Sequence, residues 1–256
     1  MRKAIIGGTG VYSAFGETKN EVVLTAYGEV SYDLIKTDEV EIVFLARHGR
    51  SHHTPPHMIN YRANMMALKM LEVDEIYATC AVGSMNDAYE PGQVVLINDF
   101  IDFTKNRVQT FFVGNDTRVA HVEMTAPYCP KLMNRFENQY SLYDIDYKGK
   151  AVYVCTEGPR FETAAEIKMY HTLGGDVVGM TNVPESVLAK ELGRCYSAVG
   201  VITNWCTGIE GKDISGHVIS ESMDKNKEAL TRLFVALLSQ NEIGEQCKCS
   251  QSLIIL

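Results

Sequence analysis

The sequence predicts one α/β domain in three layers, with a central mixed β-sheet flanked by helices. Two features lead to this prediction. Short apolar runs, rich in small and β-branched residues, alternate along the chain with helical patterns, and glycine-rich turns follow several of these runs. The length of 256 residues is ample for one large core. Because no linker divides the chain, we expect a single domain over residues 1–240 and a polar tail over 241–256.

Nine runs are predicted as strands because they are short and mostly apolar, as buried strands are. In chain order they are Ala4–Ile6, Val22–Ala26, Tyr32–Ile35, Glu41–Ala46, Ile76–Ala81, Val94–Ile97, Ala151–Cys155, Val177–Met180 and Tyr196–Ile202. Five segments have helical patterns: Tyr61–Leu71, Pro127–Gln139, Thr163–Leu173, Pro184–Leu192 and Ile214–Ser239. Pro184 suits the first turn of its helix, and Gly193 suits the end of that helix.

Composition and charge argue against several classes of protein. The formal net charge is −8, whereas proteins that bind nucleic acids through phosphate contacts are usually basic. No segment approaches the roughly eighteen uninterrupted apolar residues of a transmembrane helix. The N-terminal apolar run breaks on glycines within eight residues and predicts a first strand, not a signal peptide. We therefore expect a cytoplasmic protein that binds neither nucleic acid nor a membrane.

The chain has seven cysteines. This odd number, without a secretion signal, favours free thiols in a reducing compartment. Cys247 and Cys249 lie in the polar tail, where an inert thiol is the expected state and a redox or intersubunit role is the alternative. The other five stand singly, without the spacing of metal ligands: Cys80, Cys129, Cys155, Cys195 and Cys206.

Polar residues follow the predicted strands, which is where ligands bind in open α/β sheets. The turn GGTG at residues 7–10 offers backbone N–H groups and the Thr9 hydroxyl to an anion. It is not a dinucleotide fingerprint, because Ser13 stands where a third glycine is needed. Arg47 and His48 follow the strand Glu41–Ala46 and can hold an oxyanion, although a surface ion pair is the alternative.

Three further segments have two interpretations each. Thr181 either adds a donor to the same anion or caps the following helix. Phe161 and Glu162 offer a ring and a carboxylate to a ligand, or begin an amphipathic helix, and both can hold. At the end of the last predicted strand, Asn204 is either a cap or turn residue or a base-reading side chain at the rim of a pocket.

The histidines near residue 50 do not predict a metal site. Gly49 and the pair Pro55-Pro56 disfavour the helix that would place two imidazoles on one face. In addition, no Asp, Glu or Cys stands nearby to complete a zinc set with them. The histidines concerned are His48, His52, His53 and His57.

Several long motifs occur in a fixed order: IIGGTG, ARHGRSH, PPHMINYRANM, NDFIDFT, HVEMTAPYCPKL, TEGPRFET, MTNVPESVLAKELG and VITN. On these motifs the chain resembles the trimeric nucleoside phosphorylases, which include purine nucleoside phosphorylase and methylthioadenosine phosphorylase. The resemblance covers nearly the whole chain. It implies the nucleoside phosphorylase fold, a homotrimer with sites at subunit interfaces, and reversible phosphorolysis. Inorganic phosphate is then the co-substrate of a purine nucleoside, and neither a cofactor nor a metal is expected.

The resemblance also implies roles for individual residues. Asn204, Glu162 and His48 would be catalytic, and Met180 would lie under the ribose. His121 would reach into the 5′ pocket of a neighbouring subunit. Phosphate would be held by Thr9, Arg47, His48, Thr181 and the backbone of Ala81, and the base would be surrounded by Phe161, Glu162 and Asn204.

Within this family, the base-site pattern predicts a 6-oxopurine. The adenine-using members carry Asp at the position of Asn204, a second Asp at the position of Cys206, and Ser at the position of Glu162. A carboxylate can only accept a hydrogen bond, and 6-oxopurines offer it an N1–H that neutral adenine lacks. The Asn204 amide has both a donor and an acceptor, so it can meet O6 and N7–H together.

The 5′ end predicts a methylthio group. Purine nucleoside phosphorylases place a histidine at the start of the last long helix, where the methylthio-specific members have an apolar residue. An ungapped comparison puts Val218 there, with Ile219 beside it, and a shift of one residue would make His217 the contact. The preferred substrate is therefore predicted to be S-methyl-5′-thioinosine. The alternatives are an inosine/guanosine phosphorylase, a methylthioadenosine phosphorylase and a non-catalytic nucleotide-binding α/β domain.

Overall fold

The computed structural model describes residues 2–8, 18–37, 39–51, 53–114, 118–209, 216–240 and 247–256, without the side chains of 216–220 and 225. The strands are β1 (Arg2–Gly7), β2 (Lys19–Thr25), β3 (Gly28–Lys36), β4 (Glu41–Ala46), β5 (Val73–Ser84), β6 (Val94–Asp102), β7 (Ala120–Val122), β8 (Tyr147–Cys155), β9 (Val177–Gly179), β10 (Cys195–Trp205) and β11 (Leu253–Ile255). The helices are α1 (Tyr61–Met70), α2 (Pro130–Gln139), α3 (Ala164–Thr172), α4 (Asn182–Glu191) and α5 (Gly216–Ser239), with short 3₁₀ helices η1 (Pro56–Met58), η2 (Tyr140–Tyr143) and η3 (Cys249–Gln251).

A mixed sheet of nine strands forms the centre of the described chain, in the order β10-β6-β8-β9-β5-β1-β4-β3-β2. Strands β1, β4, β5 and β10 run parallel to one another, and β9 runs antiparallel to β5. Because β10 also pairs with β5, the strands from β10 to β5 close into a ring. The predicted three-layer α/β domain with a mixed sheet is confirmed, and the closed ring is a feature that the sequence did not predict.

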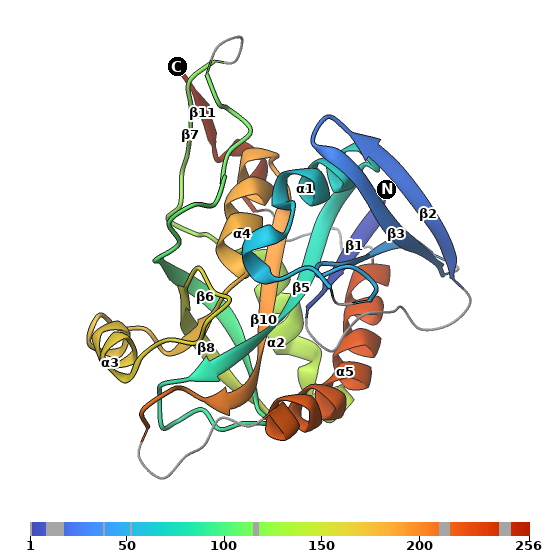
Figure 1. Ribbon diagram of the computed structural model, residues 1–256. Coiled ribbons are helices and arrows are strands. Elements are labelled where there is room, and N and C mark those ends of the chain that lie inside the picture. Colours follow the sequence, from blue (N-terminus) through green and yellow to red (C-terminus); the bar gives the residue numbers. More distant parts are fainter. Residues whose placement is uncertain are drawn as a thin grey trace.

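Helices cover the sheet in two pairs, α1 with α4 and α2 with α5, and members of both pairs contact β10 and β5 (Figure 1). The strands bury long aliphatic and aromatic side chains against these helices; Tyr77 of β5, for example, stacks on Phe234 of α5 with ring centroids 4.8 Å apart. Helix α3 packs separately. Its Ile167 and Tyr170 join Val178 and Cys206 in a second apolar cluster, which ties α3 to the ends of β9 and β10.

Each predicted strand and helix overlaps an observed one. Strand β6 is longer than predicted by five residues at its carboxyl end, and β5 and β10 continue three residues further than predicted, through Ser84 and Trp205. These ends carry polar residues and glycine, which is why an apolar pattern alone places the ends too early. The additional residues of β5 and β10 pair with each other across the two strands.

Part of the segment predicted as a tail is integrated into the domain. Residues 247–256 contain η3 and β11, and β11 pairs antiparallel with β7. Cys249 and Ser252 are buried, and the Lys190 amine of α4 donates to the Ser252 hydroxyl at 3.2 Å. Neither β7 nor β11 was predicted; each has three residues, and in the described chain they pair only with each other. In the part of the chain that is described, no helix is long and apolar enough to cross a bilayer.

Candidate active site

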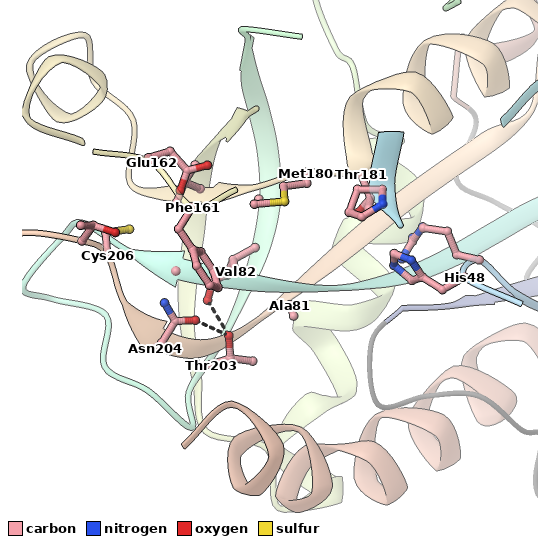
Figure 2. A pocket seen from close by; sticks show the side chains of 16 residues that line it. His48, Ala81, Val82, Phe161, Glu162, Met180, Thr181, Thr203, Asn204 and Cys206 are labelled. Carbon is pink, nitrogen blue, oxygen red and sulfur yellow. Dashed lines mark hydrogen bonds between the residues drawn. The ribbon is translucent and has the colours of Figure 1, made fainter. Parts of the chain in front are cut away.

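A cavity of about 260 Å³ opens where β4, β5 and β10 end and where the chain continues from β8 and β9. Eight of the residues predicted for a site line it: Arg47, His48, Ala81, Phe161, Glu162, Met180, Thr181 and Asn204. Figure 2 shows two ends. Glu162, Phe161, Cys206 and Asn204 gather at one, and Thr181 and His48 lie at the other.

An irregularity in the pairing of β10 with β5 sets the position of Asn204. Ile202 pairs with Val82, but Gly83 pairs with Asn204, so Thr203 is the extra residue of a bulge. Bulges of this kind redirect side chains and are common beside active sites. Gly83 makes room for this arrangement, because a Cβ there would lie 3.2 Å from the Asn204 amide nitrogen and 3.0 Å from the Cys206 sulfur.

The antiparallel strand β9 brings a third set of residues to the cavity. Gly83 and Ser84 of β5 pair with Val178 and Val177 of β9. The chain after β9 therefore runs back along β5, and Met180 and Thr181 lie beside Ala81 on the cavity wall. The rule that ligands bind at the carboxyl ends of strands selected these residues, although β9 points the opposite way from β5.

Arg47 is fixed at one end of the cavity by a buried ion pair. Its Nε and Nη2 donate to the two carboxylate oxygens of Glu185 at 2.5 and 2.8 Å, and both side chains are fully buried. Its Nη1 donates to the Thr79 carbonyl at 2.7 Å. Burial opposes the charge on Arg47, but the Glu185 carboxylate outweighs it and raises the pKa of the guanidinium. Arg47 therefore holds a permanent positive charge in a fixed orientation beside the cavity, balanced by Glu185.

Three other groups surround this charge. The Nδ1 of His48 lies 2.9 Å from the Thr54 carbonyl oxygen, which can only accept, so Nδ1 carries the proton and donates to it. Thr181 is the N-cap residue of α4, but its side chain makes no capping bond. The positive end of the helix dipole adds to the potential here. This end of the cavity is suited to an anion.

At the other end, a carboxylate lies beside a buried thiol. The Thr156 hydroxyl donates to Oε1 of Glu162 at 2.6 Å, and the Glu162 side chain is buried. Burial, and secondarily the charge of Glu162, raises the pKa of the Cys206 thiol. Cys206 is therefore neutral near pH 7, and Glu162 supplies the acceptor at this end.

The Asn204 amide is held by its own strand. Its Oδ1 accepts from the Thr203 hydroxyl at 2.8 Å, and its Nδ2 donates to the Trp205 carbonyl at 2.8 Å. An amide nitrogen carries two hydrogens and an amide oxygen two lone pairs. One donor and one acceptor of Asn204 thus remain for a ligand after these two bonds.

The structure does not bring every predicted residue to the cavity. His121 is exposed on β7 and lines no part of it. Figure 1 places β7 and β11 at the top, away from the arrowheads of β5 and β10. Thr9 and the side chains of His217, Val218 and Ile219 lie outside the described residues. Gly8 adjoins the anion end, since a Cβ there would lie 2.8 Å from Nη1 of Arg47.

Sequence reasoning missed three residues that position site groups: Glu185, Thr156 and Thr203. The role of Glu185 could not be recognised from sequence, because an acidic residue in the first turn of a helix is already explained by its interaction with the helix dipole. Thr156 and Thr203 directly follow predicted apolar strands, and this position alone could have indicated that they lie at the site.

The Thr156→Val variant is expected to lower kcat/KM for 6-oxopurine nucleosides about 10-fold or more, since a hydrogen bond to a charged group contributes roughly 1.5–3 kcal/mol. The loss reflects a less well positioned Glu162. Steady-state kinetics with inosine measure it, and Thr156→Ser, which keeps the hydroxyl, is the control that should recover most of the activity. Equal rates for the valine and serine variants would show that the hydroxyl does not position Glu162.

Comparison with known proteins gives a consistent result. The family model described as the phosphorylase superfamily matches residues 2–239. A 6-oxopurine nucleoside phosphorylase of Pyrococcus furiosus is 45% identical over 258 residues, covering 98% of this chain and 97% of the relative. A probable S-methyl-5′-thioinosine phosphorylase of Methanopyrus kandleri is 42% identical over 250 residues, covering 97% of this chain and 96% of the relative.

The solved structures give the same fold. A methylthioadenosine phosphorylase from an Antarctic soil metagenomic library superimposes with a TM-score of 0.89 at 32% sequence identity. The match covers 99% of this chain and 91% of that structure.

Proposed function

Because this chain belongs to the phosphorylase superfamily, we propose that it catalyses the phosphorolysis of 6-oxopurine nucleosides, with S-methyl-5′-thioinosine as the preferred substrate. The products are then hypoxanthine and 5-methylthioribose 1-phosphate. The proposal rests on one observation: Glu162 and Asn204 both lie at one end of a cavity whose other end is suited to an anion.

The two ends fit the two substrates of the reaction. Phosphate binds beside Arg47, His48 and Thr181, with Thr9 and the Ala81 backbone completing the site, and the purine binds beside Phe161, Glu162 and Asn204. Met180 lies between the ends, where the ribose belongs (Figure 2). As the glycosidic bond breaks, the sugar gains oxocarbenium character, and the phosphate dianion is both nucleophile and counter-charge. Positioning and electrostatics supply the acceleration.

The base end favours a 6-oxopurine. One oxygen of Glu162 accepts from Thr156, and the carboxylate can also accept N1–H of hypoxanthine or guanine. Asn204 donates to O6 and accepts from N7–H as the base leaves. Adenine would leave these buried groups unpaired, a mismatch that costs on the order of 10⁴-fold in kcat/KM. The neutral Cys206 provides no second carboxylate of the kind expected in adenine-using members.

The methylthio preference rests on Val218 and Ile219 at the start of α5, with His217 as the alternative contact. Two kinds of relative support the two readings of the 5′ group. The Methanopyrus kandleri protein is described as a probable S-methyl-5′-thioinosine phosphorylase, and the Pyrococcus furiosus protein as a 6-oxopurine nucleoside phosphorylase. The second candidate function is accordingly phosphorolysis of inosine and guanosine at the same site.

The proposal includes a homotrimer in the cytoplasm, with inorganic phosphate as co-substrate and no cofactor. His121 lies far from the cavity of its own chain, so a role in a 5′ pocket requires a neighbouring subunit. Strands β7 and β11 form a two-stranded ribbon that carries His121 and exposes apolar side chains. Ile254 of β11 is 50% exposed, and Val119, directly before β7, is 60% exposed. Such a patch favours contact with another chain. The molar mass of the particle that the chain forms in solution tests whether it is a trimer.

Steady-state kinetics with four nucleosides test the proposal. We expect kcat/KM to fall by about 10-fold or more from S-methyl-5′-thioinosine to inosine and guanosine, and by on the order of 10⁴-fold to methylthioadenosine. Cleavage should require phosphate. Methylthioadenosine as the best substrate would refute the base-site argument, inosine or guanosine as the best would establish the second candidate, and cleavage without phosphate would refute phosphorolysis.

A further inference from the structure

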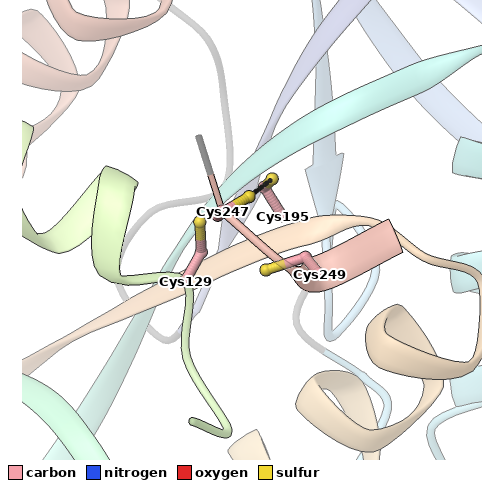
Figure 3. Close-up of side chains that lie close together, drawn as sticks. All are labelled: Cys129, Cys195, Cys247 and Cys249. Atoms are coloured by element: carbon pink, nitrogen blue, oxygen red, sulfur yellow. Dashed lines mark hydrogen bonds between the residues drawn. The ribbon is translucent and has the colours of Figure 1, made fainter. Parts of the chain in front are cut away.

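Four cysteines from three separate segments meet at one place in the structure. Cys129 directly precedes α2, Cys195 begins β10, and Cys247 and Cys249 belong to the C-terminal segment. Their four sulfur atoms all lie within 4.8 Å of one another, and the sulfurs of Cys195 and Cys247 are 3.2 Å apart (Figure 3). The sequence predicts free thiols, with five of the seven cysteines standing singly and without the spacing of metal ligands. We call these four residues the cysteine cluster.

The cysteine cluster is distinct from the candidate active site. It lies at the first residue of β10, whereas Asn204 is near the last, and a strand rises about 3.3 Å per residue. Cys129 and Cys249 are buried, while Cys195 and Cys247 are partly exposed. The cluster is therefore enclosed by protein on most sides and still open to a small ion. It is the one group of potential metal ligands found among the described residues.

The spacing of the sulfurs suits a tetrahedral ion. Four thiolates at the Zn–S distance of about 2.3 Å are separated from one another by about 3.8 Å. This edge length falls between the 3.2 Å that separates the sulfurs of Cys195 and Cys247 and the 4.8 Å within which all four sulfurs lie. Four soft ligands in such a set select zinc or iron. The N-terminus of α2 at Cys129 and the ammonium of Lys131, which acts electrostatically on Cys195, add positive potential around the thiolates.

We propose that Cys129, Cys195, Cys247 and Cys249 bind one Zn²⁺ ion per chain through four thiolates. In this step four S–H bonds each release a proton to solvent and four Zn–S bonds form, with no change in oxidation state. Pairing the same sulfurs as disulfides would require an oxidant. With no position left for water, the ion is structural and takes no part in phosphorolysis.

The consequence of the bound ion is to anchor the end of the chain. Cys247 and Cys249 precede β11, which pairs with β7. The ion would join this segment to the starts of β10 and α2, so it would hold the β7–β11 ribbon against the domain. Removing it should loosen the ribbon that carries His121, while the cavity at the far end of β10 keeps its residues.

Elemental analysis and thiol titration of the purified whole chain test the site. We expect close to one equivalent of zinc per chain and, after denaturation in a chelator without reductant, seven reactive thiols, the full number in the sequence. Fewer thiols without metal would mean disulfides, iron in place of zinc would contradict the assignment, and seven thiols with no zinc bound after reconstitution would leave no metal site. Each of these three results overturns the proposal.

Variants then assign the ligands. Cys249→Ser and Cys195→Ser should lose most of the bound zinc, and the midpoint of thermal unfolding should fall by more than about 5 °C. Cys155→Ala, a buried cysteine outside the cluster, is the matched control and should retain one equivalent. If the serine variants do not fold, Co²⁺ reconstitution of the unaltered chain gives the answer, because thiolate ligation produces a near-ultraviolet charge-transfer band. Absence of that band, or full zinc retention in both serine variants, would refute the site.

Discussion

The Asn204→Asp variant is expected to lose about 10²–10³-fold in kcat/KM for 6-oxopurine nucleosides, the usual cost of removing one donor aimed at a developing negative charge. The carboxylate keeps the shape of the amide but has no N–H to offer O6. It can still accept from Thr203 as the amide does, but it loses the bond that Nδ2 donates to the Trp205 carbonyl, and this adds to the expected loss. The exocyclic amine of an aminopurine can donate to this carboxylate, and selectivity should therefore shift toward aminopurine nucleosides.

Two comparisons isolate this effect from charge and folding. Asn134→Asp makes the same change of amide to carboxylate on the exposed face of α2, and it should leave kcat/KM within about twofold, because surface substitutions usually change stability by less than about 0.5 kcal/mol. The dissociation constant of phosphate should also be nearly unchanged in Asn204→Asp, because the anion end uses other residues. An unaltered ratio of 6-oxopurine to aminopurine activity would show that Asn204 does not read the base.

The strands, and the polar residues that follow them in the chain, could be predicted from sequence because both depend on local sequence pattern. Apolar runs place β1, β4, β5 and β10; Arg47 directly follows β4, and Asn204 follows the apolar run that predicted β10. Parallel neighbours then bring such residues to one edge. The hydrogen-bonding chemistry of the site also follows from residue type, since a carboxylate only accepts hydrogen bonds and an amide both donates and accepts them.

The arrangements that were not accessible depend on contacts between distant segments. The pairing of β10 with β5 and the bulge at Thr203 arise from register, which no local pattern specifies. Glu185 meets Arg47 across 138 residues of sequence. The cysteine cluster likewise unites three segments whose spacings in the chain resemble no metal motif, so only the fold reveals it.

The second large effect is expected at Glu185, the buried partner of Arg47. Glu185→Ala should lower the free energy of unfolding by about 3–5 kcal/mol, because it leaves a buried guanidinium without its counter-charge. The Tyr196 hydroxyl, which donates to Glu185 at 2.7 Å, also loses its acceptor. Denaturant unfolding measures the change. The control is Glu228→Ala, which breaks the exposed pair with Arg232 on α5 and should cost less than about 1 kcal/mol. Equal losses in the two variants would contradict a buried, energetically coupled pair.

A double variant, Arg47→Met with Glu185→Leu, separates the folding role of the pair from its role in phosphate binding. Replacing both charges by apolar side chains of similar volume is often neutral for stability, so the unfolding free energy should return to within about 2 kcal/mol of the parent. The KM for phosphate should nevertheless rise by about 10-fold to 100-fold, since a charge-assisted hydrogen bond is worth roughly 1.5–3 kcal/mol. A stable double variant that binds phosphate as the parent does would show that Arg47 serves the fold alone. A high KM for phosphate in a well-folded protein would instead show that the charge of Arg47, beside the cavity, serves phosphate binding.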